Sequence, residues 1–339
     1  MEYQKAIQEV RKGKLKAVYT IFGSEIFLQQ EFLQTLLNQF GEADNLDMAR
    51  IDLTEQSLDA ALDEAEMFSF FAEYRLIIVE NVQFLNANSS QKLSASEETR
   101  LLDYIGNPNE ASVIVFVVPV DQVDKRKKIT KAFQKQTAFI EVNPLKEPEV
   151  ARYIKHFVKN EQLNITKEAV QELLIRVNYQ LTEAMGEVAK LKSFSLTGQP
   201  ISIDVVRTLV PRTLESNVFE LTDAVMKKQI DKAVQIYQDL ILMKHEPIAL
   251  HALIVSQFRL IIQSKLLNQQ GYLEANIAKE LSVHPYRVKL ALQSGRRTQL
   301  KQLVSFYDEL IEVDFYMKTG IGIKETHFYL LLTKLMTVM

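Results

Sequence analysis

The sequence predicts an α/β domain with a parallel five-stranded sheet, followed by a small helical domain and then a larger all-helical domain. Three observations support this prediction. Over residues 1–140, apolar runs alternate with helical patterns. Two nearby prolines, Pro144 and Pro148, then break regular structure, and strand signals end there. From residue 215 onward, only helical periodicity is present.

Five short runs rich in apolar, β-branched or aromatic residues are the predicted strands. They lie at residues 17–22, 48–53, 75–79, 112–118 and 138–142. The third and fourth runs are nearly all apolar, which is typical of central strands in a parallel sheet that helices cover on both faces. Helical patterns alternate with the strands at residues 25–40, 56–71, 97–105 and 124–135. We therefore expect an α/β domain over residues 1–142.

The rest of the chain is predicted to form two helical domains, over residues 143–211 and 212–339. Helical periodicity in the first occurs at residues 149–160, 167–177, 181–193 and 202–209. Thr166 and Thr182 have the sequence context of helix N-caps, and Pro211 marks the next break. The second domain contains long amphipathic stretches, with turns expected near residues 245–247, 271, 284–285, 295 and 320–322.

The composition limits the class of protein. With 339 residues, of which 47% are apolar, the chain has material for two or three domains. It contains no cysteine, which excludes disulfides, thiol catalysis and cysteine-based zinc sites and is compatible with a reducing compartment. No window approaches the roughly 20 apolar residues that a membrane span needs. We expect a cytoplasmic protein with no membrane segment, no metal and no cofactor.

Charge is unevenly distributed, although the net charge is only −3. Residues 1–140 carry 15 Lys and Arg against 21 Asp and Glu, whereas the remainder carries 25 against 22. Nine carboxylates are concentrated between Glu42 and Glu66, a stretch whose single basic residue is Arg50. This asymmetry indicates different partners for the two ends of the chain, and a solvated acidic face explains it equally well.

An α/β domain followed by a small helical lid raises the question of an AAA+ ATPase. Such an enzyme needs a Gly-rich loop after the first strand, with a Lys and a Ser or Thr, to hold phosphates. Here the first strand is followed by Gly23, Ser24 and Glu25, with no second Gly and no Lys, and with an acid where phosphate needs positive charge. The sequence therefore predicts no nucleotide site. A degenerate ATPase with residual activity needs phosphate ligands that the sequence lacks.

Other signatures of catalysis are also missing. The third strand leads into Glu80 and Asn81 rather than two adjacent carboxylates, so Glu80 has no phosphate-bound magnesium to serve. The five histidines lack metal-ligand spacing, and we find neither a serine elbow nor a metalloprotease motif. We predict that the chain is not an enzyme.

An aromatic cluster lies at the end of the acidic helical pattern, in the sequence Met67-Phe68-Ser69-Phe70-Phe71-Ala72. Successive side chains on a helix are about 100° apart, so three phenylalanines in four residues cannot all face one core. At least one is expected to point outward, and an exposed apolar cluster usually marks a partner site. The alternative is that all three fill a junction between helix and sheet.

Residues 273–290 are a second candidate for binding, because their two short helical patterns resemble a helix-turn-helix DNA reader. Six Lys and Arg against two Glu in residues 271–301 favour that interpretation. Two-helix corners are also common in helical bundles, and Pro285, Val288 and Leu290 suit packing. A DNA-binding regulator with an α/β sensor domain is therefore the alternative function.

Several segments taken together resemble the delta subunits of bacterial DNA polymerase III. They are residues 18–25, 67–72, 75–79, 101–105, 123–128, 140–145, 283–289 and 313–320. No single motif is diagnostic, but the segments occur in the right order along essentially the whole chain. Related subunits carry a zinc module and a Ser-Arg-Cys motif, which a chain without cysteine cannot have. The resemblance therefore indicates delta rather than delta prime or tau/gamma.

This resemblance implies a fold and a function. The implied fold is an AAA+-like domain without a phosphate loop, a helical lid domain, and a helical collar domain that joins a five-subunit ring. The implied function is to bind and open the beta sliding clamp for loading onto primed DNA in replication. The implied partners are the clamp, the tau/gamma and delta prime subunits, and primed DNA. The chain would be a non-catalytic subunit of a holoenzyme with nucleotidyltransferase activity.

The resemblance also implies clamp-binding residues. Delta subunits bind the clamp through an apolar wedge at the tip of a helix in the first domain. Phe70 and Phe71 match this wedge, and Met67 and Phe68 flank it.

Four basic residues are candidates for contacts with DNA or with a neighbouring subunit. Lys125, Arg126 and Lys128 belong to one basic stretch, for which a solvated charged face is the alternative. Lys318 precedes Thr319 and Gly320 in a segment that resembles the family.

Overall fold

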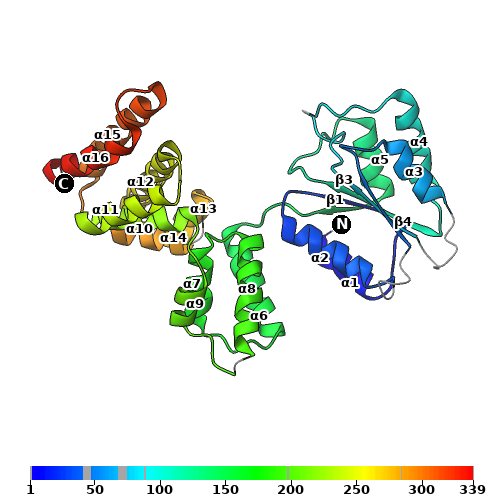
Figure 1. The fold of residues 1–339 in the computed structure, drawn as a ribbon, viewed down its shortest axis with the longest axis horizontal. Helices are drawn as coiled ribbons and strands as arrows, with labels where there is room; N and C mark the ends of the chain where they lie inside the picture. Colours follow the sequence, from blue (N-terminus) through cyan, green and yellow to red (C-terminus); the bar gives the residue numbers. More distant parts are fainter. Residues whose placement is uncertain are drawn as a thin grey trace. The chain divides into compact units, whose positions relative to one another are not determined.

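The computed structural model describes residues 2–40, 47–67, 75–87, 89–196, 198–283 and 285–338, without the side chains of residues 215 and 335–338. The chain forms two compact units, Met1–Leu145 and Lys146–Met339, and each is considered by itself (Figure 1). The first unit contains the sheet, and the second is helical.

The sheet of the first unit has five parallel strands in the order β2-β3-β4-β1-β5. The strands are β1 (Val18–Phe22), β2 (Met48–Asp52), β3 (Arg75–Glu80), β4 (Ser112–Val118) and β5 (Ala138–Glu141). Each predicted strand is confirmed, with its ends displaced by at most one residue. The two most apolar runs are β3 and β4, and both lie inside the sheet rather than at an edge.

Helices cover both faces of this sheet (Figure 1). They are α1 (Tyr3–Arg11), α2 (Ile26–Leu37), α3 (Leu58–Glu66), α4 (Ala95–Gly106) and α5 (Lys128–Gln136). Alternate strand residues point to opposite faces. Phe116 of β4 packs on Phe133 of α5 over one face, whereas Tyr19 of β1 packs on Phe32 of α2 over the other.

Two predicted helix boundaries in this unit are wrong by four residues or more. The helix expected over residues 56–71 ends at Glu66, and Met67 is extended with ψ of 146°. Its last turn carries Asp63, Glu64 and Glu66 and no basic residue, which is unfavourable at the negative end of the helix dipole. The helix expected from Asp124 begins at Lys128, because Lys127 is extended and serves as its N-cap.

The second unit contains eleven helices among its described residues. They are α6 (Glu147–Asn160), α7 (Lys167–Arg176), α8 (Leu181–Ser195), α9 (Ile203–Leu209), α10 (Leu214–Met226), α11 (Ile230–Leu242), α12 (Pro247–Gln269), α13 (Glu274–Glu280), α14 (Pro285–Ser294), α15 (Leu300–Thr319) and α16 (Lys324–Val338). Thr166 caps α7 as predicted, with its side chain accepting the amide hydrogen of Ala169. Thr182 does not cap α8, because Gln180 occupies the N-cap position.

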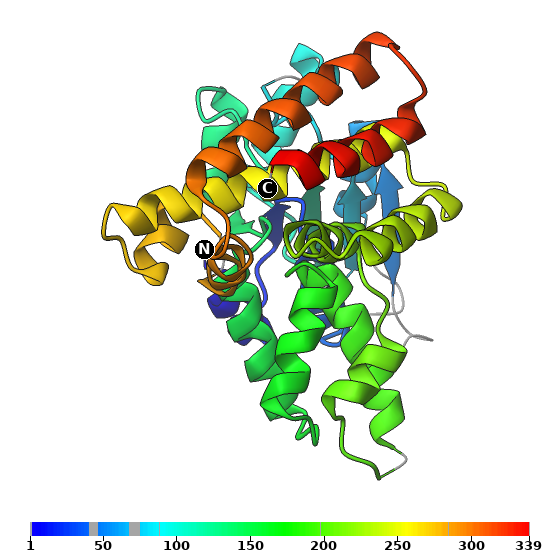
Figure 2. The same ribbon diagram turned by 90° about the vertical axis from the view of Figure 1, so that its left-hand side faces the viewer.

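Helix α12 is the central helix of α10–α16, and α15 and α16 lie alongside it (Figure 2). Phe258 of α12 packs on Phe306 of α15, and His251 is also buried. By length and composition α12 is apolar enough to cross a membrane, contrary to the prediction from the sequence. Its burial among other helices is that of a core helix, so this composition is explained by packing.

Candidate functional site

The loop between β1 and α2 occupies the place where a nucleotide-binding protein of this topology holds phosphates. Gly23 in this loop has φ of 137°, and a Cβ atom there would lie 2.3 Å from the main-chain carbon and oxygen of Val142. The amide of Glu25 donates a hydrogen bond to the same Val142 oxygen over 3.0 Å. The chain that leaves β5 therefore packs directly against this loop.

The amides of Ser24 and Glu25, just before α2, already have partners within the protein. The amide of Ser24 donates to Oδ1 of Asp121 over 3.2 Å, so a carboxylate of the chain itself accepts from the loop. Nε2 of Gln29 donates to the Gly23 oxygen over 2.6 Å, which closes the loop from the other side. Glu25, the N-cap residue of α2, is buried. The loop thus presents bonded amides and two acids, which do not suit a phosphate group.

The end of β3 is also organised by internal contacts. Glu80 pairs with Arg50 of β2 over 3.0 Å. Asn81 has a positive φ of 57°, and its amide group donates to Asp52 over 2.8 Å. Hydrogen bonds from Asn81 and Thr54 lower the pKa of Asp52. Among the residues that the structure describes, no group of three histidines and carboxylates is placed to hold a metal ion.

The predicted clamp-binding segment begins where α3 ends. Met67 is described and its side chain is exposed, whereas Phe68, Phe70 and Phe71 lie outside the described residues. Both ends of the segment are anchored: Ala65 is fully buried, and Arg75 at the start of β3 forms ion pairs with Glu64 and with Asp47.

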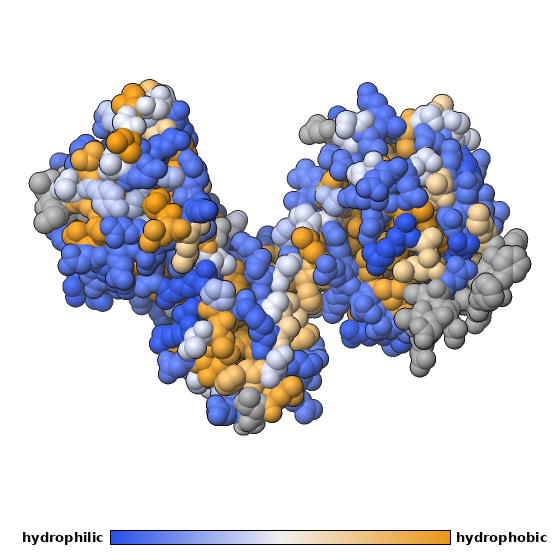
Figure 3. Space-filling view, in the orientation of Figure 1, coloured by the Kyte–Doolittle hydropathy of each residue, from blue (hydrophilic) through white to orange (hydrophobic). Residues whose placement is uncertain are grey.

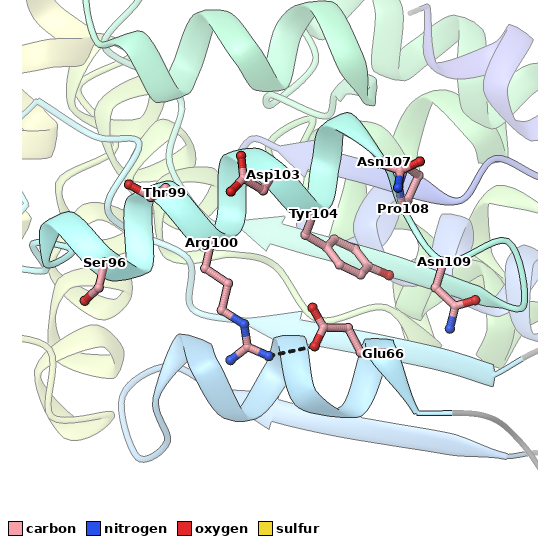
Figure 4. A pocket seen from close by; sticks show the side chains of 9 residues that line it. All are labelled: Glu66, Ser96, Thr99, Arg100, Asp103, Tyr104, Asn107, Pro108 and Asn109. Atoms are coloured by element: carbon pink, nitrogen blue, oxygen red, sulfur yellow. Dashed lines mark hydrogen bonds and ion pairs between the residues drawn. The ribbon is translucent and has the colours of Figure 1, made fainter.

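A polar groove lies beside the end of α3, between α3 and α4 (Figure 4). Its lining residues are Glu66, Ser96, Thr99, Arg100, Asp103, Tyr104, Asn107, Pro108 and Asn109. Arg100 of α4 reaches across and pairs with Asp63 over 2.6 Å, with Glu66 over 2.9 Å and with Asp59 over 3.0 Å. The bond to Asp63 contributes most to a raised pKa of Arg100.

Asn109 and Tyr104, which also line the groove, contact the same end of α3. Nδ2 of Asn109 donates to the Ala65 carbonyl over 3.2 Å, and this carbonyl belongs to the last turn of α3. Tyr104 is buried at the base of the groove, and this burial raises the pKa of its hydroxyl to about 12. This groove is not among the sites predicted from the sequence. Its sequence signal was Arg100, a lone basic residue in a helix that faces an acidic one.

The basic residues of the stretch 125–128, and Lys318, differ in what their side chains contact. Lys127 is partly buried, and its ammonium donates to the carbonyls of Phe84 and Asn86, each over 2.8 Å. Lys125, Arg126 and Lys128 are exposed, which fits both a partner contact and the alternative of a solvated charged face. Arg126 pairs with Asp124 over 2.9 Å and lowers the pKa of that carboxyl to about 2. Lys318 belongs to the other unit and pairs with Asp314 over 2.6 Å.

The two-helix segment at residues 273–290 consists of α13 and the start of α14, and it packs as part of the bundle. Ile277, Ala278 and Val288 form a small buried core between the two helices. Arg287 of α14 pairs with Glu147 over 2.8 Å, and α14 also packs on α12. A reading helix must present its side chains to a groove of DNA. The partners of α14 therefore favour the packing interpretation of this segment over the regulator.

Comparison with known proteins gives matches over most of the chain. Residues 19–143 match the family model "DNA polymerase III, delta subunit", and residues 215–335 match the model "DNA polymerase III delta subunit, C-terminal domain". The DNA polymerase III subunit delta of Bacillus subtilis (strain 168) is 35% identical over 97% of this chain and 95% of its own length. A probable DNA polymerase III subunit delta of Aquifex aeolicus is 24% identical, over 77% of this chain and 74% of its own.

The solved structure of the Bacillus subtilis DNA clamp loader delta protein (YqeN) is similar along the whole chain. Its TM-score is 0.62 at 34% identity, and the match covers 99% of each chain. The predicted AAA+-like α/β domain followed by helical domains is therefore the fold of this chain.

Proposed function

We propose a function that starts from one premise: the chain belongs to the family of DNA polymerase III delta subunits. It is a clamp-loader subunit of that polymerase and acts in DNA replication. Beyond this, we propose that it works in the cytoplasm, that it has no catalytic activity of its own, and that it binds and opens the beta sliding clamp.

The proposed clamp contact is made by Phe70 and Phe71, with Met67 and Phe68 beside them. The observation that carries this proposal is the end of α3, where the chain leaves the helix at an exposed Met67 while Ala65 stays buried. Arg100 and Asn109 hold this helix end in place. Aromatic anchors that enter a desolvated pocket on a partner are typical hot spots, each costing about 2–4 kcal/mol on truncation.

We propose that the chain opens the clamp because it binds two states of the clamp with different affinities. The wedge binds the opened clamp interface more tightly than the closed one and so shifts the clamp population toward the open state. The chain's own loop after β1 has its amides bonded to Val142 and Asp121, which supports nucleotide binding in the neighbouring tau/gamma and delta prime subunits instead. Their nucleotide state would change the accessibility of the wedge.

The helical domain over residues 212–339 is proposed as the collar that joins the ring. Where Figure 3 shows this domain, polar side chains cover most of the visible face and apolar side chains form separate groups. One row of exposed apolar side chains follows α15, at Val304, Ile311 and Phe315, whose spacing of seven and four residues puts them on one helix face. This row is our candidate for contact with a neighbouring subunit.

The decisive experiment compares clamp binding by the wild-type chain and by a Phe70→Ala, Phe71→Ala double variant. We expect the variant to bind the clamp of the same organism at least about 100-fold more weakly, since two aromatic anchors are lost. A Leu242→Ala, Met243→Ala variant is the control, because it removes two adjacent exposed apolar side chains at the end of α11. Binding retained by the phenylalanine variant would disprove the wedge, and binding by neither protein would contradict the proposed function.

A further inference from the structure

A cluster of basic side chains lies where α14 ends and α15 begins. We call Lys289, Arg296, Arg297 and Lys301 the basic corner. All four side chains are exposed. The sequence contains no Asp or Glu between Glu280 and Asp308.

The charges of the basic corner are not neutralised within the described parts of the chain. Many other basic side chains form ion pairs, including Arg287 of the same helix, which pairs with Glu147 over 2.8 Å. Within those parts, no hydrogen bond or ion pair engages the side chains of the four corner residues. The Asp223 carboxylate, which contacts α14, already bonds Ser294 over 2.7 Å and Lys227 over 2.7 Å.

The turn that carries the two arginines has a fixed backbone. Nζ of Lys265 in α12 donates to the Gly295 oxygen over 2.7 Å and to the Thr298 oxygen over 2.6 Å. Gly295 lies tightly against α12, since a Cβ atom there would be 2.8 Å from Cγ2 of Ile261. Both residues that flank the arginine pair are thus held inward, which leaves Arg296 and Arg297 directed to solvent.

The corner continues one face of α14. Lys289 and Gln293 are one helical turn apart and both are exposed. The amide of Arg296 bonds the carbonyl of Gln293, so the helical path continues into the turn. Cationic and amide side chains therefore follow one another along a single edge of the bundle.

We propose that the basic corner binds the sugar–phosphate backbone of nucleic acid. Surfaces that bind nucleic acid are polar and strongly positive, and most of their hydrogen bonds go to phosphate oxygens. Protein interfaces usually contain apolar or aromatic anchors. Between Leu273 and Val304, the described residues include no exposed large apolar side chain, so Lys289, Arg296 and Arg297 have no such anchor beside them in the sequence. An acidic protein surface is therefore the less suitable partner.

Binding at the corner is independent of base sequence. Val288 and Ala291 of α14 are buried, and Arg287 is held by Glu147, so only one edge of the helix reaches solvent. Such an edge contacts backbone and does not read bases in the major groove. The site is separate from the clamp-binding segment, and it rests on the proposed function only in the choice of primed DNA as the probe.

The test measures binding of the full chain to a fluorescein-labelled primed DNA, a duplex with a single-stranded template overhang, by fluorescence anisotropy over a range of salt concentrations. An Arg296→Gln, Arg297→Gln variant should bind about tenfold more weakly at low salt. Its slope of log affinity against log salt should be shallower by about 1.4–1.8, the amount expected for two lost phosphate contacts.

The matched control is Lys228→Asn, Lys244→Asn, which also removes two exposed charges from the helical unit. Both lysines have positive φ, 55° and 63°, a conformation that asparagine tolerates. The control should keep the wild-type affinity and salt slope within about twofold. Circular dichroism should show the same helix content for all three proteins.

Four results would overturn the proposal. They are absence of DNA binding by the wild-type chain, unchanged affinity and salt slope in the arginine variant, an equal loss in the lysine control, and competition by polyglutamate as strong as that by single-stranded DNA at equal charge. The last result would identify a general surface for acidic proteins. Clamp binding by the same variants separates this proposal from the proposed function, because the arginine variant should still bind the clamp and the phenylalanine variant should still bind DNA.

Discussion

The ammonium group of Lys127 lies 2.8 Å from the main-chain oxygen of Phe84, a residue 43 positions earlier in the chain. A second bond to the Asn86 oxygen, also 2.8 Å long, makes Lys127 the tie between the loop after β3 and the start of α5. Its neighbours Lys125 and Lys128 are exposed and make no such contact. One basic stretch therefore contains a structural lysine between candidate partner contacts.

Replacing Lys127 by Met should destabilise the first unit by about 1–3 kcal/mol, because two partly buried carbonyls lose a charged donor. Lys125→Met and Lys128→Met should each stay within about 0.5 kcal/mol of the wild type. Urea unfolding followed by circular dichroism measures all three. Equal effects at the three positions would contradict the structural role of Lys127.

Replacing Arg100 by Met should weaken clamp binding by roughly three- to tenfold, with about 1 kcal/mol or less lost in stability. The carboxylates of Asp59, Asp63 and Glu66, which follow one face of α3 from its first turn to its last, then repel one another. Glu66 is next to the proposed wedge. Arg126→Met is the control, because its side chain is far more exposed and pairs with a single carboxylate. Clamp affinity by surface plasmon resonance distinguishes the two, and equal affinities would show that the end of α3 needs no bracing.

Replacing Gly23 by Ala should cost about 3 kcal/mol or more, because the new Cβ atom meets main-chain atoms of Val142 that no side-chain rotation can move. Gly13→Ala is the matched control. Gly13 also has a positive φ, of 71°, but nothing lies within 4 Å of its Cβ position, so only about 1 kcal/mol is expected. Urea unfolding of both variants tests the difference, and similar losses would contradict the close contact with Val142.

His251 should make the helical unit less stable as pH falls. Burial lowers its pKa below the ordinary value of 6.5, so the folded state favours the neutral ring. The stability from this group is complete above pH 6.5 and is lost as pH falls toward the folded pKa. Nε2 bonds the Leu310 carbonyl, whereas Nδ1 is buried without a partner. Asp314, Lys318 and His327 are the charged or titratable groups that act on the ring.

A His251→Gln variant tests this dependence. Its amide can still donate to Leu310, but it does not titrate. We expect the loss of stability between pH 7.5 and pH 5.5 to be smaller in the variant than in the wild type. Because the other histidines are common to both proteins, the difference isolates His251. An equal loss in both would contradict the assignment.

The sheet could be predicted closely from the sequence because its pattern is local. Strands such as β3 and β4 are buried on both faces, so nearly every residue in them is apolar. The end of α3 could not be predicted in the same way. In the sequence, the aromatic run after Glu66 continues the helical pattern of α3. The helix ends at Glu66, where its last turn is acidic. The arginine that pairs with this turn, Arg100, belongs to α4 and is far away in the sequence.

Side-chain roles that depend on tertiary contacts were equally hidden. Nothing in a run of four basic residues distinguishes Lys127 from its neighbours until Phe84 and Asn86 are placed beside it. For Gly320, the structure supplies a physical role that the sequence did not reveal. It has φ of 77° and caps the C-terminus of α15. This accounts for the glycine in a segment whose only known feature was its resemblance to the family.

The contact between Gly23 and Val142 also limits what mutation can recover. A lysine and a second glycine could be introduced into the loop after β1 by a few base changes, but the main chain leaving β5 would still lie against the loop at Gly23. Binding a phosphate there would require that segment to be rerouted as well, and the Ser24 amide to be released from Asp121. No single one of these changes would therefore be enough to make the loop hold phosphate.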